Sequence, residues 1–287
     1  MARLFCFGIG FTARVLVRQM MAAGWQVSGT ARTAEKCAAL GAEGLSMVRF
    51  DGTAPLPASA LEGVTHVLIS VPPGEDGDPV LRQHGADLAA LPGLKWIGYL
   101  STTGVYGDRG GAWVDEDTPI APDLPRSLRR AEAERGWLDL AKSGADKTGA
   151  PVHVFRLAGI YGPGRSAIDN LRAGTAQRIV KPGQVFCRIH VADIAQVLRA
   201  SMERPTPGRI YNVSDDEPAP PQDVITHGAR LLGVAPPPEV PFEQAELSPM
   251  ARTFYQDSKR VKNHRIRQEL GVTLLYPTYR EGLKALL

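Results

Sequence analysis

The stretch "RLFCFGIGFTARVLVRQMMAAG" (residues 3–24) decides the fold of this chain. It begins with a short apolar run over residues 3–8, which is typical of a buried strand. Apolar residues then recur at helical spacing as far as Met21, and Gly24 follows as a stop signal, which predicts a helix. The chain therefore opens with a strand, a glycine-containing turn and a helix.

The same alternation continues through the first third of the chain. Further strands are expected over 25–32, 45–51, 65–73 and 95–102, with helices over 33–42 and 81–91. Strands that alternate with helices pair in parallel and are joined by crossover helices. The sequence therefore predicts an α/β fold with a doubly wound parallel sheet of the Rossmann type.

The order changes after residue 110. A helix is expected near 126–142, a strand with its loop over 151–164, a helix over 190–203 and a strand over 208–215. The chain is proline-rich from residue 215 on, with helices between the prolines. We expect a nucleotide-binding domain formed by residues 1–158 with 186–214, and a smaller C-terminal substrate lobe formed by residues 159–185 with 215–287.

Composition and charge limit the function classes. Of the 287 residues 44% are hydrophobic and 22% are charged, and the net charge of +3 is too small to argue for nucleic acid. No apolar run approaches the roughly 18 residues of a membrane span. Three scattered cysteines (Cys6, Cys37 and Cys187) and no C-x-x-C predict neither a metal site nor disulfides. We expect a cytoplasmic protein without a signal peptide that binds a small-molecule substrate. Helices on the sheet faces could form a homodimer.

The first turn carries a cofactor motif. Gly8, Gly10 and Ala13 form G-x-G-x-x-A between a strand and a helix. The first glycine permits the tight turn, the second lets the backbone approach a pyrophosphate, and the small third residue lets helix and strand pack closely. The alternative is a tight turn that binds nothing. The residues expected at the cofactor are Gly8, Ile9, Gly10, Phe11, Thr12 and Ala13.

Residues at the end of the second predicted strand usually determine whether such a site prefers NAD or NADP. NAD selection usually uses an acidic residue here, but none occurs over residues 27–33, where Thr30 and Arg32 stand instead. Arg32 could pair with a 2′-phosphate, so we expect NADP, with NAD and a solvated Arg32 as alternatives. Asp51 is a candidate for the adenine edge. Ser70, Val71 and Pro72 are expected beside the cofactor ribose.

Several later stretches resemble one superfamily. These are "YLSTTGVYGD" (99–108), "RLAGIYGPGR" (156–165), "IHVADIAQVLRASME" (189–203), "GRIYNVSDDEP" (208–218) and the terminal "LGVTLLYPTYREGLKALL" (270–287). Together they are similar to motifs of the extended short-chain dehydrogenases/reductases, the NAD-dependent epimerase/dehydratase family. The resemblance covers nearly the whole chain. It implies an NAD(P)-dependent oxidoreductase that acts on a sugar-like or carbonyl/hydroxyl small molecule.

The resemblance also implies roles for particular residues. Thr102 matches the Ser/Thr that hydrogen-bonds the substrate oxygen, and its neighbour Ser101 is expected beside the cofactor. A cluster of hydroxyl residues that only forms a turn is the alternative. Tyr161 matches the "YGPG" loop that borders cofactor and substrate in relatives.

The family's Tyr-x-x-x-Lys pair is missing. No tyrosine occurs between Tyr106 and Tyr161, and no lysine between Lys95 and Lys142. Such departures mark atypical members of the superfamily. The helix near 126–142 instead carries Ser127 and Arg130, besides Arg126. Arg130 could supply positive charge but cannot shuttle a proton, and both arginines could equally be solvated.

Three functions follow from these observations. The first is an oxidoreductase in which Thr102 polarises the substrate oxygen and Tyr161, Ser127 or a bound water supplies the proton, with Arg130 as a cationic group. The second is a non-catalytic NADP(H) sensor, because the binding loop is preserved while the Tyr/Lys pair is lost. The third is a nucleotide-binding assembly subunit.

Overall fold

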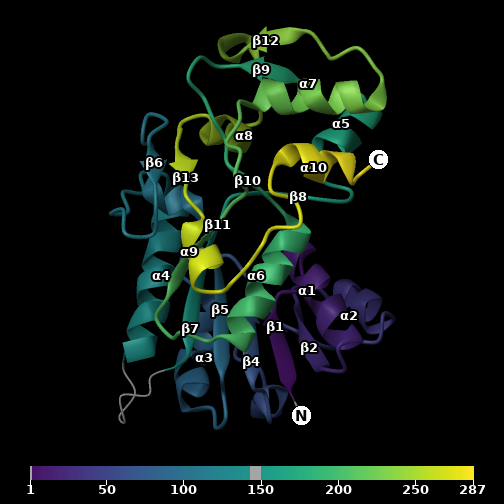
Figure 1. The fold of residues 1–287 in the computed structure, drawn as a ribbon. Coiled ribbons are helices and arrows are strands. Elements are labelled where there is room, and N and C mark those ends of the chain that lie inside the picture. The colour runs from purple at the N-terminus through teal and green to yellow at the C-terminus, as the bar shows by residue number, and fades with distance from the viewer. Residues whose placement is uncertain (1, 143–149) are drawn as a thin grey trace. The chain divides into compact units, whose positions relative to one another are not determined.

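The computed structural model describes residues 2–142 and 150–287. A seven-stranded parallel sheet forms its centre, with the strand order β11-β7-β5-β4-β1-β2-β3 (Figure 1). This confirms the predicted α/β fold with a doubly wound parallel sheet. The strands are β1 (Arg3–Phe7), β2 (Gln26–Ala31), β3 (Ser46–Arg49), β4 (His66–Ile69), β5 (Trp96–Thr102), β7 (Val152–Leu157) and β11 (Ile210–Val213).

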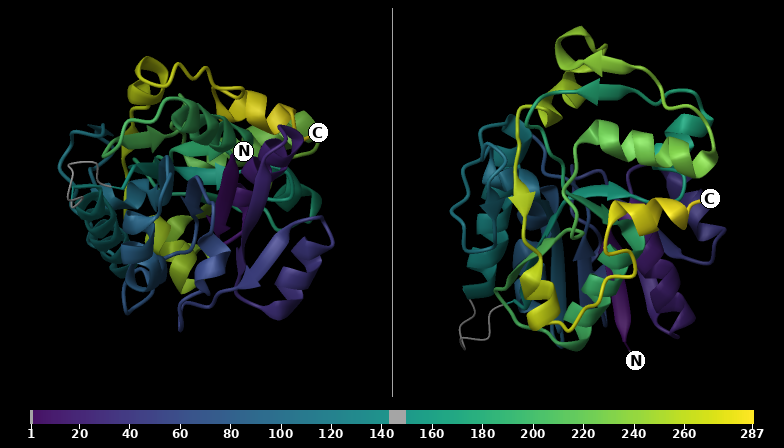
Figure 2. Two further views of the ribbon diagram at one scale, coloured as in Figure 1. Left: turned by 90° about the horizontal axis from the view of Figure 1, so that it is seen from below. Right: turned by 45° about the horizontal axis from the view of Figure 1, so that its top comes forward.

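Helices lie on both faces of this sheet (Figures 1 and 2). They are α1 (Phe11–Ala22), α2 (Ala34–Gly41), α3 (Pro79–Ala90), α4 (Pro125–Lys142) and α6 (Val191–Glu203). The expected strand over residues 65–73 is shorter, because β4 ends at Ile69 before the two prolines of the next loop. Helix α3 begins before the expected residue 81, because the Asp78 side chain accepts hydrogen bonds from the N–H groups of Val80 and Leu81 and so caps it.

The chain divides into two compact units. The first unit comprises Met1–Thr102, Pro125–Arg156 and Ala195–Tyr211, and the second comprises Thr103–Leu124, Leu157–Ile194 and Asn212–Leu287. Residues 103–124, 157–158, 186–194 and 212–214, expected with the nucleotide-binding domain, group with the second unit. Residues 103–124 do so because β6 (Trp113–Val114) pairs in parallel with β13 (Arg260–Val261).

One apolar cluster holds the first unit together. Phe5 and Phe7 of β1 pack in it with residues of β4, β5, α3 and α4. Trp137 of α4 is fully buried there and donates a hydrogen bond from Nε1 to Asp78 at 3.2 Å, which ties α4 to the start of α3. Truncation of a buried tryptophan of this kind costs about 3–5 kcal/mol.

The second unit contains short elements that the sequence did not predict individually. Its strands form two-stranded pairs, β8 with β10, β9 with β12 and β6 with β13. A small core contains Ile168, Val224 and Leu283. The elements of this unit not yet given are β8 (Gly159–Tyr161), α5 (Ala167–Arg172), β9 (Arg178–Val180), β10 (Arg188–His190), α7 (Pro221–Leu232), β12 (Glu239–Pro241), α8 (Pro249–Phe254), α9 (His264–Gln268) and α10 (Tyr279–Lys284), with 3-10 turns at Thr103–Tyr106 and Phe242–Gln244. The first unit has one further 3-10 turn, at Ala58–Leu61, among the residues that the structure describes.

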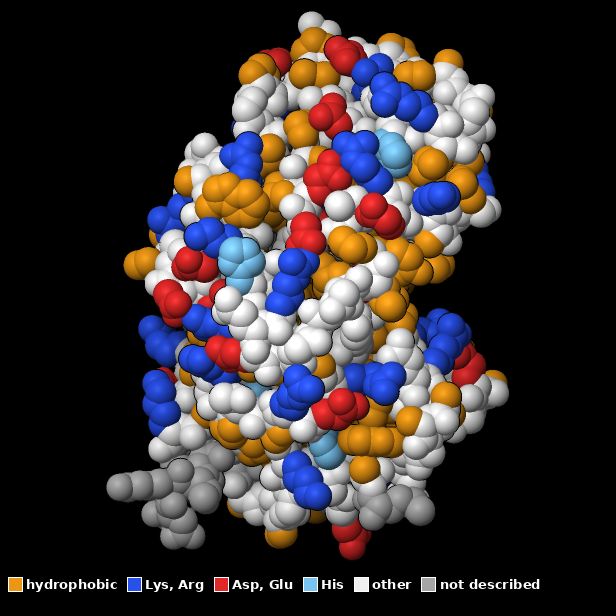
Figure 3. Space-filling view, viewed as in Figure 1, with side chains coloured by type: hydrophobic (Ala, Val, Ile, Leu, Met, Phe, Trp, Pro, Cys, Tyr) orange, Lys and Arg blue, Asp and Glu red, His pale blue; other side chains and the backbone are white. Residues whose placement is uncertain are grey.

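The surface is mixed in charge. On the face that Figure 3 shows, basic and acidic side chains are interspersed, in keeping with the net charge of +3. Within residues 2–142 and 150–287, none of the helices combines the length and apolar character needed to cross a membrane.

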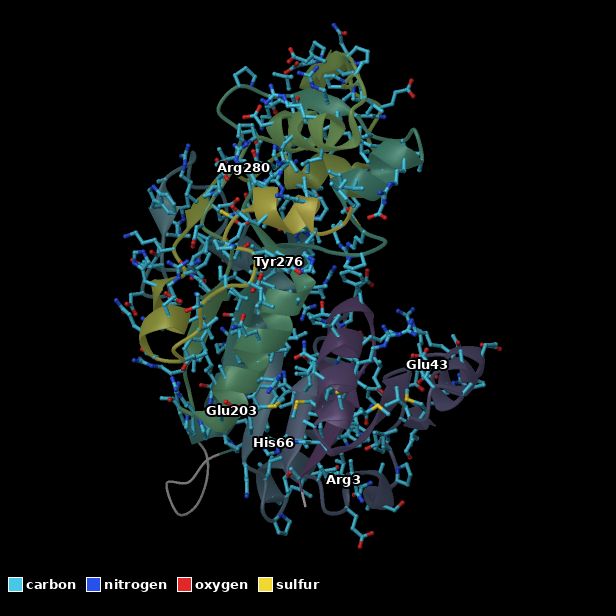
Figure 4. The ribbon with its side chains drawn as sticks, turned by 45° about the vertical axis from the view of Figure 1, so that its right-hand side comes forward. Arg3, Glu43, His66, Glu203, Tyr276 and Arg280 are labelled. Carbon is cyan, nitrogen blue, oxygen red and sulfur yellow. The ribbon has the colours of Figure 1, made fainter. Side chains whose placement is uncertain are left out.

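Two buried histidines of the first unit should make stability depend on pH. Burial lowers the pKa of both His66 and His153 from 6.5 to about 4, and the nearby Lys95 adds to the effect at His66. Figure 4 shows His66 near the same end of the first unit as Arg3. In the unfolded chain these two histidines take up protons near pH 6.5, and in the folded chain only near pH 4. Their contribution to stability is therefore fully present above pH 6.5 and is lost as the pH falls toward 4.

At about 1.36 kcal/mol per pKa unit, each ring contributes at most roughly 3 kcal/mol to this loss. Urea unfolding at pH 7.5, 6.5, 5.5 and 4.5 measures it. The His153→Gln variant keeps an acceptor for the Thr206 N–H that His153 Nε2 binds at 2.8 Å, and should show a shallower decline. A free energy of unfolding that stays constant between pH 6.5 and 4.5 would contradict the expectation.

Candidate functional site

A cavity of about 1030 Å³ lies within the first unit, at the carboxyl ends of its parallel strands. It is bounded by the loop after β1, the ends of β2 and β3, and the loop after β4. Open sheets of this type bind ligands at that edge. The cavity brings together many of the predicted cofactor residues, namely Gly8, Ile9, Gly10, Thr30, Arg32, Asp51, Ser70, Val71 and Pro72.

The two glycines of the first loop have different structural roles. Gly8 has a φ of +85°, and a Cβ at this position would lie 3.0 Å from Val71 Cγ2, so the turn requires glycine. Gly10 has an ordinary φ of −97°. A Cβ on Gly10 would meet no atom within 4 Å. The backbone at Gly10 therefore borders open space of the kind that a pyrophosphate would fill.

Thr30 holds this loop in place. Its hydroxyl accepts a hydrogen bond from Gly8 N at 2.9 Å, and its carbonyl accepts one from Ile9 N at 3.0 Å. Thr30 thus acts on the loop itself, a role that the sequence did not reveal. No side chain caps α1, so the N–H groups of its first turn face the cavity end of the helix, where the helix dipole favours an anion.

The remaining predicted loop residues begin helix α1. Thr12 and Ala13 are buried and do not line the cavity, and neither does Phe11. Ala13 is fully buried, as the close approach of helix and strand requires. These three residues can contribute backbone N–H groups to a phosphate site, but not side chains.

Two cations stand at the wall of the cavity. The side chains of Arg32 and Lys36 line it, and in the described part of the chain neither forms an ion pair or a hydrogen bond. Asp51 is engaged elsewhere, because it accepts bonds from Thr53 N and Thr53 Oγ1 at 3.0 and 2.6 Å and pairs with Arg49 at 3.0 Å. The Thr53 hydrogen bonds and Arg49 hold the pKa of Asp51 below its ordinary value. Arg32 and Lys36 therefore offer two cationic groups to an anion in the cavity, which Glu75 and Asp76 also line.

The sequence analysis did not identify Lys36 as a residue of the cavity. Its backbone N–H donates to Thr33 Oγ1, the N-cap of α2, at 3.3 Å. Lys36 therefore lies in the first turn of α2, four residues after Arg32. The capping threonine and the following lysine were visible in the sequence and could have indicated the second cation.

Thr102 is the last residue of β5 and is half-buried at the carboxyl end of that strand. Its neighbour Ser101 points elsewhere. Ser101 Oγ donates to Glu134 Oε1 at 2.5 Å, and Ser101 does not line the cavity. The Arg156 guanidinium binds Glu134 through Nε and Nη2, at 3.2 and 2.8 Å. Ser101 therefore belongs to a buried polar network that the sequence did not predict.

Helix α4 places Arg130 against β5. Arg130 Nη1 donates to Leu100 O at 2.7 Å and to Tyr99 Oη at 3.1 Å. Arg130 is half-buried, and its guanidinium is hydrogen-bonded to β5. Burial raises the pKa of Tyr99 despite the guanidinium beside it, which makes its phenol a weaker acid. Ser127 is almost fully buried on the inner side of α4.

Tyr161 lies in the second unit. Its ring contacts that of His190 at a centroid distance of 5.2 Å, and its hydroxyl lies against Gly282 of α10. Burial, with the carboxylates of Asp215 and Asp193, raises the pKa of Tyr161. A phenol with a raised pKa is a weaker acid, so this environment favours a packing role over proton donation.

Comparison with known proteins gives relatives but no matching family model. The chain is 28% identical to protein YeeZ of Escherichia coli K12 over 249 residues, which cover 83% of this chain and 86% of YeeZ. It is 29% identical over 217 residues to a 3-diazoavenalumate denitrifying reductase of Streptomyces sp, covering 70% of this chain and 67% of that protein.

Solved structures extend the comparison. A conserved protein of unknown function from Silicibacter pomeroyi is 52% identical with a TM-score of 0.90, covering 100% of this chain and 98% of that one. A Methylobacillus flagellatus protein proposed to be an NAD-dependent epimerase/dehydratase is 26% identical, with a TM-score of 0.74 and coverage of 99% and 97%. The dTDP-glucose 4,6-dehydratase of Bacillus anthracis, solved with NAD, shares the fold at 18% identity, with a TM-score of 0.78 and coverage of 99% and 94%.

The sheet order, the glycine loop and these similarities agree with the motifs of the sequence. The chain has the fold of the extended short-chain dehydrogenases/reductases, and the solved structures similar to it include NAD-dependent epimerase/dehydratase proteins.

Proposed function

We propose that this protein is an NADP(H)-dependent oxidoreductase that reduces or oxidises a carbonyl or hydroxyl group of a small, sugar-like molecule. The observation that carries the proposal is the cavity of the first unit, where open space borders Gly10 and where Arg32 and Lys36, which form no ion pair with any residue that the structure describes, line the wall. The similarity to a protein named as a reductase favours redox chemistry over a non-catalytic role.

The nucleotide preference rests on charge. Arg32 and Lys36 offer positive charge where the 2′-position of an adenosine ribose would lie, beyond a pyrophosphate at Gly10. The carboxylate of Asp51 is already bound by Thr53 and Arg49, and residues 27–33 contain no acid for a ribose 2′-hydroxyl. These features favour NADP(H) over NAD(H).

Replacing Arg32 and Lys36 together with alanine should reverse this preference. Charge-assisted hydrogen bonds contribute about 1.5–3 kcal/mol each, so loss of both cations should lower NADP affinity by roughly 100-fold or more. Affinity for NAD should change less than about twofold, because NAD lacks the 2′-phosphate. Calorimetric titration of both nucleotides measures the ratio.

The matched control is Arg18→Ala. Arg18 is an exposed arginine of α1 whose side chain pairs with Glu43 at 3.4 Å, outside the cavity. It should leave both affinities unchanged. Equal losses for NADP and NAD in the Arg32/Lys36 variant would remove the 2′-phosphate argument.

The chemistry divides between cofactor and chain. A bound nicotinamide supplies or accepts the hydride. The Thr102 hydroxyl, at the end of β5, donates a hydrogen bond to the substrate oxygen and stabilises the charge that develops there. Ser127 is buried, Arg130 is bonded to β5, and the pKa of Tyr161 is raised. We therefore assign the transferred proton to a bound water molecule.

Thr102→Ala should lower turnover by roughly 100-fold, the usual effect of removing one such donor. NADP(H) affinity should remain within about twofold, since Thr102 does not line the cavity. The absorbance of NADPH, followed with aldehydes, ketones and nucleotide sugars, measures turnover in both proteins. Tight cofactor binding without turnover on any substrate would count against an enzyme and favour an NADP(H) sensor.

A further inference from the structure

Arg82 of helix α3 joins two loops that bound the cavity. Its Nη2 donates to Gly52 O at 3.1 Å, in the loop after β3, and its Nη1 donates to Asp76 O at 2.7 Å, in the loop after β4. No hydrogen bond joins these two loops directly in the described residues 50–53 and 70–77. The planar guanidinium is suited to this task, because its fork presents two N–H groups in fixed directions.

Both loops are shaped to meet the start of α3. Gly52 has a φ of +85°, and a Cβ there would lie 2.8 Å from Pro79 Cβ, so its backbone lies against the first turn of the helix. Gln83 Nε2 adds contacts to Gly52 O and Thr53 O, each at 3.4 Å. The other loop closes on itself, with Gly74 N donating to Gly77 O at 2.9 Å. Arg82 therefore links two loops, 51–53 and 74–77, each of which is also held by other contacts.

The expected position of the adenine base relative to these two loops follows from the other parts of the proposed site. A pyrophosphate at Gly10 and a 2′-phosphate at Arg32 and Lys36 place the adenosine base farther along the same cavity. Gly52, Thr53, Gly74, Asp76, Gly77 and Arg82 line the same cavity and lie on the two loops that Arg82 joins and on α3. We propose that Arg82 is a positioning residue for the adenine base, setting the separation of the loops 51–53 and 74–77 between which the base lies. This inference rests on the proposed NADP(H) site.

Variants of Arg82 distinguish a role that depends on its two hydrogen bonds to the loops from one that depends only on its positive charge. Arg82→Ala should weaken binding of 2′,5′-ADP and of NADP by the same factor, about tenfold, since two hydrogen bonds to carbonyls are lost. Arg82→Lys keeps the charge but not the fork and should recover little of this loss. Fluorescence anisotropy of the bound etheno-adenine analogue of NADP should fall in both variants, because the base is less restrained. A purely structural role of Arg82 would lower the melting temperature without changing this anisotropy.

A second pair of variants moves one loop directly. Gly52→Ala should weaken the binding of 2′,5′-ADP, because the added Cβ clashes with Pro79 and displaces the loop 51–53. The matched control is Gly63→Ala, which carries the same left-handed strain at a φ of +66° but meets only Arg3 Nη1, at 3.9 Å. Gly63→Ala should leave binding unchanged.

The possible outcomes are distinct. If Arg82→Ala binds 2′,5′-ADP as tightly as the wild type does and gives the same anisotropy for the etheno-adenine analogue, Arg82 does not position the base. The proposed NADP(H) site would be unaffected by that result. Full rescue by Arg82→Lys would show that only charge matters and would also overturn the positioning role. Failure of the wild-type protein to bind any nucleotide would overturn the proposed function and the inference together.

Discussion

Gly10→Val should abolish NADP(H) binding. The backbone at Gly10 borders open space within the cavity, and a Cβ there meets no protein atom within 4 Å. The valine therefore fits the folded chain but occupies the volume that the pyrophosphate needs. Losing two charge-assisted hydrogen bonds of about 1.5–3 kcal/mol each corresponds to a weakening of roughly 100-fold or more. Calorimetric titration with NADPH measures the loss, and a thermal melt without nucleotide shows whether the fold is kept.

The control for this substitution is Gly41→Val, at the end of α2. Gly41 also has open space around its Cβ and no positive φ, but it does not line the cavity. The same change in side chain should leave affinity within about twofold of the wild type. Gly8 is a poor test site, because its φ of +85° strains any other residue. Normal NADPH affinity in folded Gly10→Val protein would show that the loop does not hold the pyrophosphate.

Arg156→Leu should cause the largest loss of stability. Arg156 and Glu134 are 4% and 2% exposed and form a bidentate ion pair, so removing the guanidinium leaves a carboxylate buried without its partner. Breaking a buried pair in this way costs about 3–5 kcal/mol. The midpoint of urea unfolding at pH 7.5 measures the change.

Two further variants distinguish the buried charge from the arginine side chain as such. Arg135→Leu changes an exposed arginine of α4, the helix that carries Glu134, and should alter stability by no more than about 0.5 kcal/mol. The double variant Arg156→Leu, Glu134→Gln removes the stranded charge and should recover a large part of the loss. A single-variant loss as small as that of Arg135→Leu would show that Glu134 is not dependent on Arg156.

Local sequence signals predicted the nucleotide end of the first unit. The order of strand, turn and helix and the G-x-G-x-x-A spacing depend on neighbouring residues, and the structure shows the expected strands around one cavity. Thr30 is at the expected place with a different task, because nothing in the sequence shows that its hydroxyl meets the N–H of Gly8, which lies 22 residues away.

The other end of the site depends on contacts between distant residues. Ser101 was expected beside the cofactor, but its hydroxyl meets Glu134, which is 33 residues away, and Glu134 meets Arg156, which is 22 residues farther on. A charged residue on a helix is usually solvated, so periodicity gives no sign of a buried pair. The sequence likewise predicts Arg130 as a solvated or cationic group, whereas its bonds to β5 follow from how α4 lies on the sheet.

Binding of NADP(H) to the first unit is the central claim, and calorimetric titration of the full chain with NADP+, NADPH, NAD+ and NADH tests it most directly. The account predicts saturable heats for NADP+ and NADPH, weaker binding of the two NAD forms, and a rise in melting temperature with NADPH that grows with its concentration. No heat and no change in melting temperature with any of the four nucleotides would contradict it.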